Sequence, residues 1–206
     1  MLGIQNRVEC RSDITPTNIN DDVLYSTTPI VLRNFCVDWP IVQAGLNSNH
    51  DAAEYMRNVY SGMPISGCYG PEENQGRVFY NSDMSGFNFQ ASQIDLNLLL
   101  NKLLEHQDVE SPPTMYMAST DARRWFPQLV ADNDFEIPDH QAITSVWLGN
   151  QSKIAPHWDF PTNLACNVVG KRRFVLFPTE QVGNLYPGPI EFAPGGQEIS
   201  LVDLSN

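Results

Sequence analysis

Positive charge is scarce in this sequence. Its 206 residues include 12 Lys and Arg against 24 Asp and Glu, which gives a net charge of −12. Binding to nucleic acid or to an anionic membrane requires clustered basic side chains, so we expect neither as a partner. Apolar residues make up 42% of the chain and aromatic residues 10%. This composition is typical of a folded domain and excludes the disordered class of low hydrophobicity.

Long hydrophobic runs and paired cysteines are also lacking. No apolar run approaches the roughly 18 residues that a membrane span requires, and the first residues contain no signal-peptide core. We therefore expect a soluble, cytoplasmic protein. The four cysteines (Cys10, Cys36, Cys68 and Cys166) form no CxxC pair. Their spacing excludes a zinc knuckle and a thioredoxin-like motif, and predicts free thiols.

The patterns of polar and apolar residues predict one mainly β domain with two outer helices. We expect a polar N-terminal arm at 1–28 and a single domain at 29–206. Ser48 or Asn49 would cap the first helix, and Ser92 with Asp95 has the spacing of a capping box for the second. The helices are expected at 48–61 and 92–107. Strands are expected at 29–35, 114–119, 142–149 and 154–160, with short strands within 63–91 and a β-hairpin at 163–178 that turns at Gly170.

Two His-x-Asp motifs occur, and only one has a geometry that suits a metal. His106 and Asp108 fall at the end of the second predicted helix, where residues two apart point about 200° apart. His106 is better explained as a last-turn cation that interacts favourably with the helix dipole. His157 and Asp159 fall on an extended segment, where residues two apart share a face. An imidazole and a carboxylate there could bind one ion, or the aspartate could simply accept a hydrogen bond from the histidine.

Three basic residues follow at the predicted hairpin turn. Strand alternation places Lys171 and Arg173 on one face, and Arg172 on the other with Phe174 and Leu176. If the second face lines a barrel interior, the Arg172 guanidinium requires an anionic partner, and a dicarboxylate could bind it in bidentate fashion. The alternative is a solvated hairpin tip.

The segment SVWLGNQSKIAPHWDFPTNLACNVVGKRRFVLFPTEQVGNLYPGP resembles the metal-binding core of the cupin-like, JmjC-type Fe(II)/2-oxoglutarate oxygenases, which include asparaginyl hydroxylases and many bacterial cupin-like proteins. The earlier PIVLRNFCVDWP resembles the first core strand of that family and its Trp-Pro turn. The similarity extends from about residue 29 to the last residue. It implies a double-stranded β-helix with flanking helices, and it says little about the substrate.

The resemblance also implies roles for five residues. His157 and Asp159 match the first two iron ligands. Asn163 matches an asparagine near the cosubstrate. Arg172 falls where relatives usually have a lysine that binds the distal carboxylate of 2-oxoglutarate, and Tyr116 matches a tyrosine that contacts the same group, although a core aromatic on a strand would explain Tyr116 equally simply.

The sequence departs from the family pattern at two points. Ile154 stands where relatives commonly have a Ser or Thr that hydrogen-bonds the cosubstrate. No histidine follows His157, whereas the third ligand of the family lies on a later strand; His50, His106 and His140 all precede the motif. The sequence therefore resembles a family member that ends before its last core strands, a form that would leave strand edges and apolar surface exposed.

Two functions follow as expectations. The first is an oxygenase of the hydroxylase type, in which Fe(II) and 2-oxoglutarate support oxidative decarboxylation and hydroxylation of a C–H bond in an unknown substrate, either a protein side chain or a small molecule. The second is a non-catalytic cupin-like binding module, or an inactive fragment that lacks the third metal ligand. The expected exposed edges also favour association, with a homodimer as one form, or aggregation.

Overall fold

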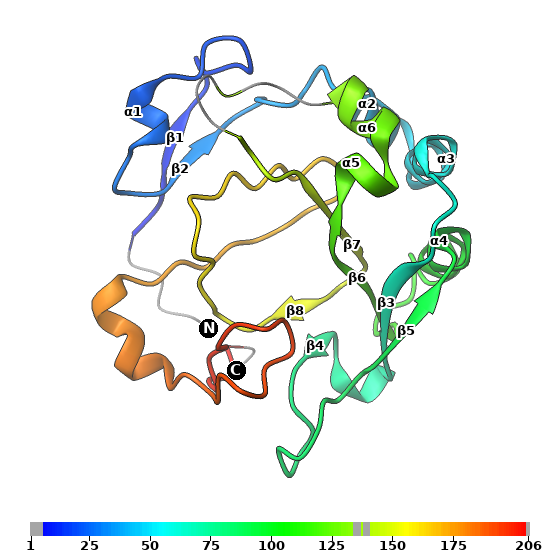
Figure 1. Cartoon of the computed structure of the whole chain (residues 1–206), viewed down its shortest axis with the longest axis vertical. Coiled ribbons are helices and arrows are strands. Elements are labelled where there is room, and N and C mark those ends of the chain that lie inside the picture. The colour runs from blue at the N-terminus through cyan, green and yellow to red at the C-terminus, as the bar shows by residue number, and fades with distance from the viewer. Residues whose placement is uncertain (1–5, 134–136, 138–140, 205–206) are drawn as a thin grey trace. The chain divides into compact units, whose positions relative to one another are not determined.

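The computed structural model describes residues 6–133, 137 and 141–204, and these fall into two compact units (Figure 1). The described residues of 1–61, 121–144 and 166–170 form the first unit, and those of 62–120, 145–165 and 171–206 form the second. The candidate site residues, His157 and Asp159 among them, all belong to the second unit.

The first unit is mainly helical. Its elements are β1 (Glu9–Arg11), α1 (Asp21–Leu24), β2 (Ile30–Leu32), α2 (Pro40–Asn47), α3 (Asn49–Val59), α5 (Ala122–Trp125) and α6 (Pro127–Asn133). β1 pairs in parallel with β2. Ile41, Met56 and Phe126 are buried apolar residues of this unit. The buried side chain of Asn133 accepts a hydrogen bond from the backbone N–H of Ile41 at 3.0 Å, which ties α6 to the start of α2.

The second unit is built on a four-stranded sheet with the strand order β5-β3-β6-β7. The strands are β3 (Ile65–Gly70), β5 (Gln90–Ile94), β6 (Thr114–Asp121) and β7 (Ser145–Gly149). β3 is antiparallel to both β5 and β6. A smaller parallel pair joins β4 (Arg77–Val78) to β8 (Lys153–Ile154), and the remaining elements are α4 (Leu96–Glu105) and the 3-10 helices η1 (Glu72–Asn74) and η2 (Thr179–Leu185).

The core of this unit lies where α4 and the sheet contribute buried apolar side chains, among them Ile65, Leu96, Leu99 and Met117. Leu96 and Leu99 are three residues apart and so share one face of the helix. The combination of an antiparallel sheet with helices confirms the α+β prediction. β6, β7 and the short strands within 63–91 also lie where the sequence predicts them.

The capping prediction for α3 is confirmed, and that for α4 is partly wrong. The Ser48 side chain accepts a hydrogen bond from the backbone N–H of Asp51 at 2.9 Å, as an N-cap does. Asp95 caps α4 by accepting from the N–H of Asn97 at 2.7 Å. Ser92 is not a cap, because it pairs with Gly67 in the β3–β5 ladder. A strand therefore runs up to Ile94, and the predicted helix begins four residues later than 92.

The predicted β-hairpin is wrong in its strands and right in its turn. Gly170 has a φ of +75°, and its carbonyl accepts a hydrogen bond from the Asn167 side chain at 3.1 Å. No strand is assigned between residues 155 and 178. Val169, which precedes Gly170, lies close to Gly45 of α2 within the first unit: a Cβ added to Gly45 would be 2.9 Å from the Val169 side chain. Alternating apolar residues favour a strand, but the tertiary contacts of each residue decide whether it finds a partner strand.

The expected N-terminal arm contains regular structure, because β1 and α1 both lie within residues 1–28. The boundary at residue 28 stays a prediction. Across the described part of the chain, no helix combines the length and the apolar character that crossing a membrane would require.

Candidate metal and cosubstrate site

His157 and Asp159 lie on the same side of the extended segment that follows β8. Their closest atoms, Nε2 of His157 and Oδ1 of Asp159, are 4.0 Å apart. Both side chains are partly open to solvent, with 29% and 42% of their surface exposed. The extended backbone explains this proximity, since residues two apart project from the same face.

The ring orientation of His157 leaves one nitrogen available. Its Nδ1 lies 2.8 Å from the backbone carbonyl oxygen of Ala155. A carbonyl oxygen can only accept a hydrogen bond, so Nδ1 carries the proton in this contact. In the neutral ring, Nε2 then keeps its lone pair on the side of Asp159. Protein metal sites commonly orient a ligating histidine through such a contact at its second nitrogen.

Asp159 is held by two amide side chains. Nδ2 of Asn163 donates to Oδ2 of Asp159 at 2.9 Å. Nε2 of Gln197 donates to the other oxygen, Oδ1, at 3.3 Å. The family resemblance of the sequence predicted a role for Asn163 but did not include Gln197. A residue 38 positions away carries no local signal, and only the pairing of its segment with that of His157 brings it close.

These donor atoms suit a divalent metal ion in their chemical type, but their number fits only part of a metal site. An imidazole nitrogen and a carboxylate oxygen are ligands of non-haem Fe(II), and the orienting contacts to Ala155 and Asn163 are those expected around such ligands. Within the described residues, however, no three His, Cys, Asp or Glu side chains gather closely enough to bind a metal together. His157 and Asp159 thus fit two positions of a metal site.

Tyr116 and Arg172 form a second contact within this unit. The positive charge of Arg172 acts on the Tyr116 hydroxyl, and its guanidinium lies 5.2 Å from the centre of the Phe174 ring. Burial raises the pKa of Tyr116, and the positive charge and hydrogen bond of Arg172 partly oppose that rise. The phenol is therefore neutral at physiological pH. The neutral hydroxyl therefore keeps a proton that it can donate to an acceptor.

Arg172 does not lie in a barrel interior. The residue is exposed, as are Phe174 and Leu176 on the same side of the alternating pattern, at 54% and 55%. This exposure agrees with the alternative of a solvated segment. Because Arg172 is exposed, its guanidinium is accessible to an anionic ligand from solution.

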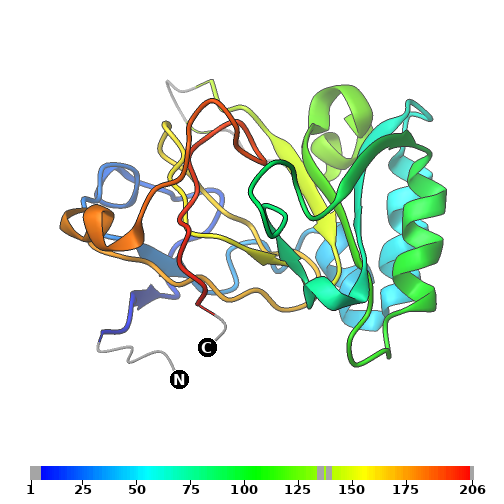
Figure 2. The ribbon, with the colours of Figure 1, turned by 90° about the horizontal axis from the view of Figure 1, so that it is seen from below.

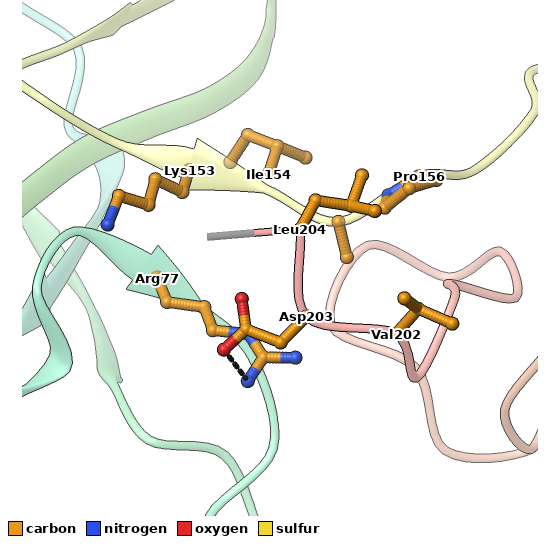
Figure 3. A pocket seen from close by; sticks show the side chains of 8 residues that line it. Arg77, Lys153, Ile154, Pro156, Val202, Asp203 and Leu204 are labelled. Atoms are coloured by element: carbon orange, nitrogen blue, oxygen red, sulfur yellow. Dashed lines mark hydrogen bonds and ion pairs between the residues drawn. The ribbon is translucent and has the colours of Figure 1, made fainter. Parts of the chain in front are cut away.

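Ile154 lines a small cavity of about 50 Å³ beside β8 (Figure 3). Arg77, Pro156, Asp203 and Leu204 are among the other lining residues. The Ile154 side chain offers no hydrogen bond at a position where relatives commonly have a hydroxyl group. Its backbone is paired with Val78 in the β4–β8 ladder, so it helps to place the His157 segment.

The second His-x-Asp motif behaves as expected for a helix end. His106 is the C-cap of α4, and its Nδ1 lies 2.9 Å from the carbonyl oxygen of Lys102. The imidazole thus adds a second donor to the Lys102 carbonyl, which also accepts from the backbone N–H of His106 at 3.2 Å. Within the described residues, it joins no group of potential metal ligands.

A search of protein families matches residues 16–206 to the family described as the cupin-like domain. The match covers most of the chain and includes every residue of the candidate site. This chain belongs to the cupin-like domain family. The antiparallel sheet and flanking helices of the cupin-like chain are consistent with the jelly-roll, double-stranded β-helix class of that family.

Two curated proteins are similar to this cupin-like chain. JmjC domain-containing protein D of Dictyostelium discoideum is 22% identical over 196 residues, which cover 84% of this chain and 40% of that protein. Jumonji C domain-containing protein 5 of Drosophila melanogaster is 30% identical over 187 residues, which cover 85% of this chain and 42% of that protein. The cupin-like chain thus spans about two fifths of the length of these relatives, and both support a JmjC-type member of the family.

Proposed function

We propose that this cupin-like chain binds Fe(II) and 2-oxoglutarate as part of an oxygenase of the hydroxylase type. The observation that carries the proposal is the pair of donor atoms Nε2 of His157 and Oδ1 of Asp159, 4.0 Å apart, with the ring of His157 oriented by the Ala155 carbonyl. Family membership and the JmjC-type relatives support it.

In this proposal, each residue has a role in binding or orientation. His157 and Asp159 hold the metal ion, and Asn163 keeps the Asp159 carboxylate in place through Oδ2. Arg172 and Tyr116 together bind a carboxylate of 2-oxoglutarate, the first through its charge and the second through its hydroxyl proton. Bound Fe(II) would supply the oxygen chemistry that couples decarboxylation of 2-oxoglutarate to hydroxylation of a C–H bond.

A binding experiment tests the proposal without requiring a known substrate. Isothermal titration of 2-oxoglutarate, with Mn(II) as a redox-stable substitute for Fe(II), should give binding that depends on the metal. His157→Ala should abolish that dependence, because one of the two metal ligands is lost. His106→Ala is the matched control, since His106 belongs to the other His-x-Asp motif and should leave binding unchanged.

The result that contradicts the proposal is 2-oxoglutarate binding that is absent, or that occurs equally with and without Mn(II). Either outcome favours the second candidate, a non-catalytic cupin-like binding module or an inactive fragment. The observation on its side is the absence, among the described residues, of three His, Cys, Asp or Glu side chains close enough to share an ion.

A further inference from the structure

Two cysteines that lie far apart in the sequence come together within the first unit. Cys36 belongs to the turn between β2 and α2, and Cys166 begins the segment 166–170 of the same unit. A side-chain hydrogen bond with Cys166 is the largest cause that raises the pKa of Cys36, ahead of burial. A hydrogen bond between two thiols requires their sulfur atoms to lie in contact, which is also the first condition for a disulfide.

Helix α2 holds both cysteine segments through contacts that do not involve the thiols. In the first segment, the carbonyl of Val37, the residue after the cysteine, accepts a hydrogen bond from Nε2 of Gln43 at 2.7 Å. In the second, Val169, three residues after the cysteine, packs so closely on Gly45 that a Cβ there would lie 2.9 Å away. Gln43 and Gly45 both belong to α2, so one helix supports both segments.

This support is itself well anchored. Helix α2 packs beside α3, and the two are blue to cyan in Figure 2. Ile41 of α2 is buried, and its N–H donates to the Asn133 side chain. Each cysteine segment also has an internal hydrogen bond: the Trp39 N–H donates to the Cys36 carbonyl at 3.1 Å, and the Asn167 side chain donates to the Gly170 carbonyl at 3.1 Å. The fold of the unit therefore holds the two thiols near each other.

We propose that Cys36 and Cys166 form a reversible disulfide when hydrogen peroxide oxidises the protein. One thiol attacks the O–O bond of the peroxide and becomes a sulfenic acid, with release of one water. The other thiol attacks the sulfenic sulfur, which forms the S–S bond and releases a second water. The two cysteines together lose two electrons and two protons, and the peroxide is reduced to two molecules of water. A dithiol reductant reverses the change by exchange.

The arrangement favours this bond over other products of oxidation. A thiol with a raised pKa reacts slowly with reagents from solution, but a neighbouring thiol in contact has a high effective concentration. Cys10 is exposed and has no such neighbour to favour a link, and Cys68 lies on β3 of the second unit. The inference goes beyond the proposed function, since it requires neither a metal ion nor 2-oxoglutarate.

The disulfide would restrict a stretch of chain that joins two parts of the candidate site. Cys166 follows Asn163 by three residues and precedes Arg172 by six. Its bond to Cys36 closes a loop longer than about 100 residues, and a cross-link over such a loop strongly restricts the unfolded chain. The oxidised protein should therefore resist thermal unfolding better than the reduced protein does.

Mass spectrometry of the full chain tests the proposal directly. The reduced protein is treated with hydrogen peroxide, remaining thiols are blocked with N-ethylmaleimide, and peptides are separated without a reductant. We expect one linked pair of peptides, joining Cys36 to Cys166, that disappears after treatment with dithiothreitol. Cys36→Ser and Cys166→Ser should each abolish the link. Cys10→Ser and Cys68→Ser are the matched controls and should form it as the unmodified chain does.

Thermal unfolding gives an independent measurement. Oxidation of the double variant Cys10→Ser/Cys68→Ser should raise its midpoint by about 5–10 °C, because the disulfide constrains the unfolded chain. The same treatment after addition of Cys36→Ser should leave the midpoint unchanged. Circular dichroism of each reduced variant shows whether it is folded. A link that forms without any rise would contradict the argument that the folded unit already holds the two thiols together.

Several results of the peptide analysis would overturn the proposal. It is wrong if Cys36 and Cys166 stay reduced while peroxide oxidises Cys10, or if both become sulfinic acids without a link. It is also wrong if the link joins other cysteines or two copies of the chain. None of these results bears on the proposed function, because Mn(II) and 2-oxoglutarate are left out of the reaction.

Discussion

The positive charge of Arg172 acts on the hydroxyl of Tyr116, which lies far earlier in the chain on strand β6, and opposes the rise in the pKa of Tyr116 that burial causes. This interaction links the two residues that the family resemblance assigns to a single carboxylate. Within the described residues, Arg172 has no ion pair with a protein carboxylate, so its charge is available to a ligand.

The first prediction concerns this pair. Arg172→Gln should weaken Mn(II)-dependent binding of 2-oxoglutarate about tenfold, at the low end for a charged hydrogen bond because the residue is exposed. Tyr116→Phe removes a neutral donor and should cost only a few-fold. Calorimetry measures both. Arg173→Gln is the control, because Arg173 is the next residue, is also exposed and carries the same charge. An equal loss in Arg173→Gln would show that general charge matters rather than the position of Arg172 beside Tyr116.

The second prediction concerns the start of α4. Asp95→Ala should lower the free energy of unfolding by about 1 kcal/mol, because the N–H of Asn97 loses its capping acceptor. Ser92→Ala should change it by less than about 0.5 kcal/mol, since Ser92 is exposed on β5. Urea unfolding followed by circular dichroism measures both values. A larger loss for Ser92→Ala than for Asp95→Ala would place the cap at Ser92 after all.

The third prediction compares two buried threonines of β6. Among the described residues, the hydroxyl of Thr114 finds no hydrogen-bond partner, although only 2% of Thr114 is exposed. Thr114→Val should therefore leave stability unchanged or raise it, because an unsatisfied buried hydroxyl is destabilising. The Thr120 hydroxyl donates to the carbonyl of Ala118 at 2.9 Å, so Thr120→Val should cost about 1 kcal/mol. Thermal unfolding of the two variants should differ in sign, and a clear loss for Thr114→Val would contradict the argument.

The fourth prediction concerns cysteine reactivity. All four cysteines are free thiols, as the sequence predicts, and Cys10 is exposed. The hydrogen bond to Cys166, together with burial, raises the pKa of Cys36, and burial raises the pKa of Cys68. Because the thiolate is the reactive form, iodoacetamide at pH 8 should modify Cys10 well before Cys36 or Cys68.

Peptide mass spectrometry at successive times measures this order. Labelling in 8 M urea is the control, because unfolding should bring the four rates close together. Modification of Cys36 as fast as Cys10 in the folded protein would show that its thiol is neither buried nor hydrogen-bonded as described.

Much of the local structure was predictable from short sequence patterns. Ser48 as a helix cap, His106 at a helix end, and an extended segment through His157 all depend on residues within four positions of one another. Ser92 shows where such reasoning fails, because a capping-box spacing was present and the residue nevertheless joined a ladder with Gly67. Pairing between strands outweighed the local preference.

The sequence by itself determined that His157 and Asp159 share a face, because the two-residue repeat of an extended chain is a local property. Only the tertiary structure decided what surrounds them. Gln197 reaches Asp159, and Arg172 reaches Tyr116, through the course of segments distant in sequence. That course depends on turns, strand register and the burial of residues such as Ile199, which no local pattern specifies.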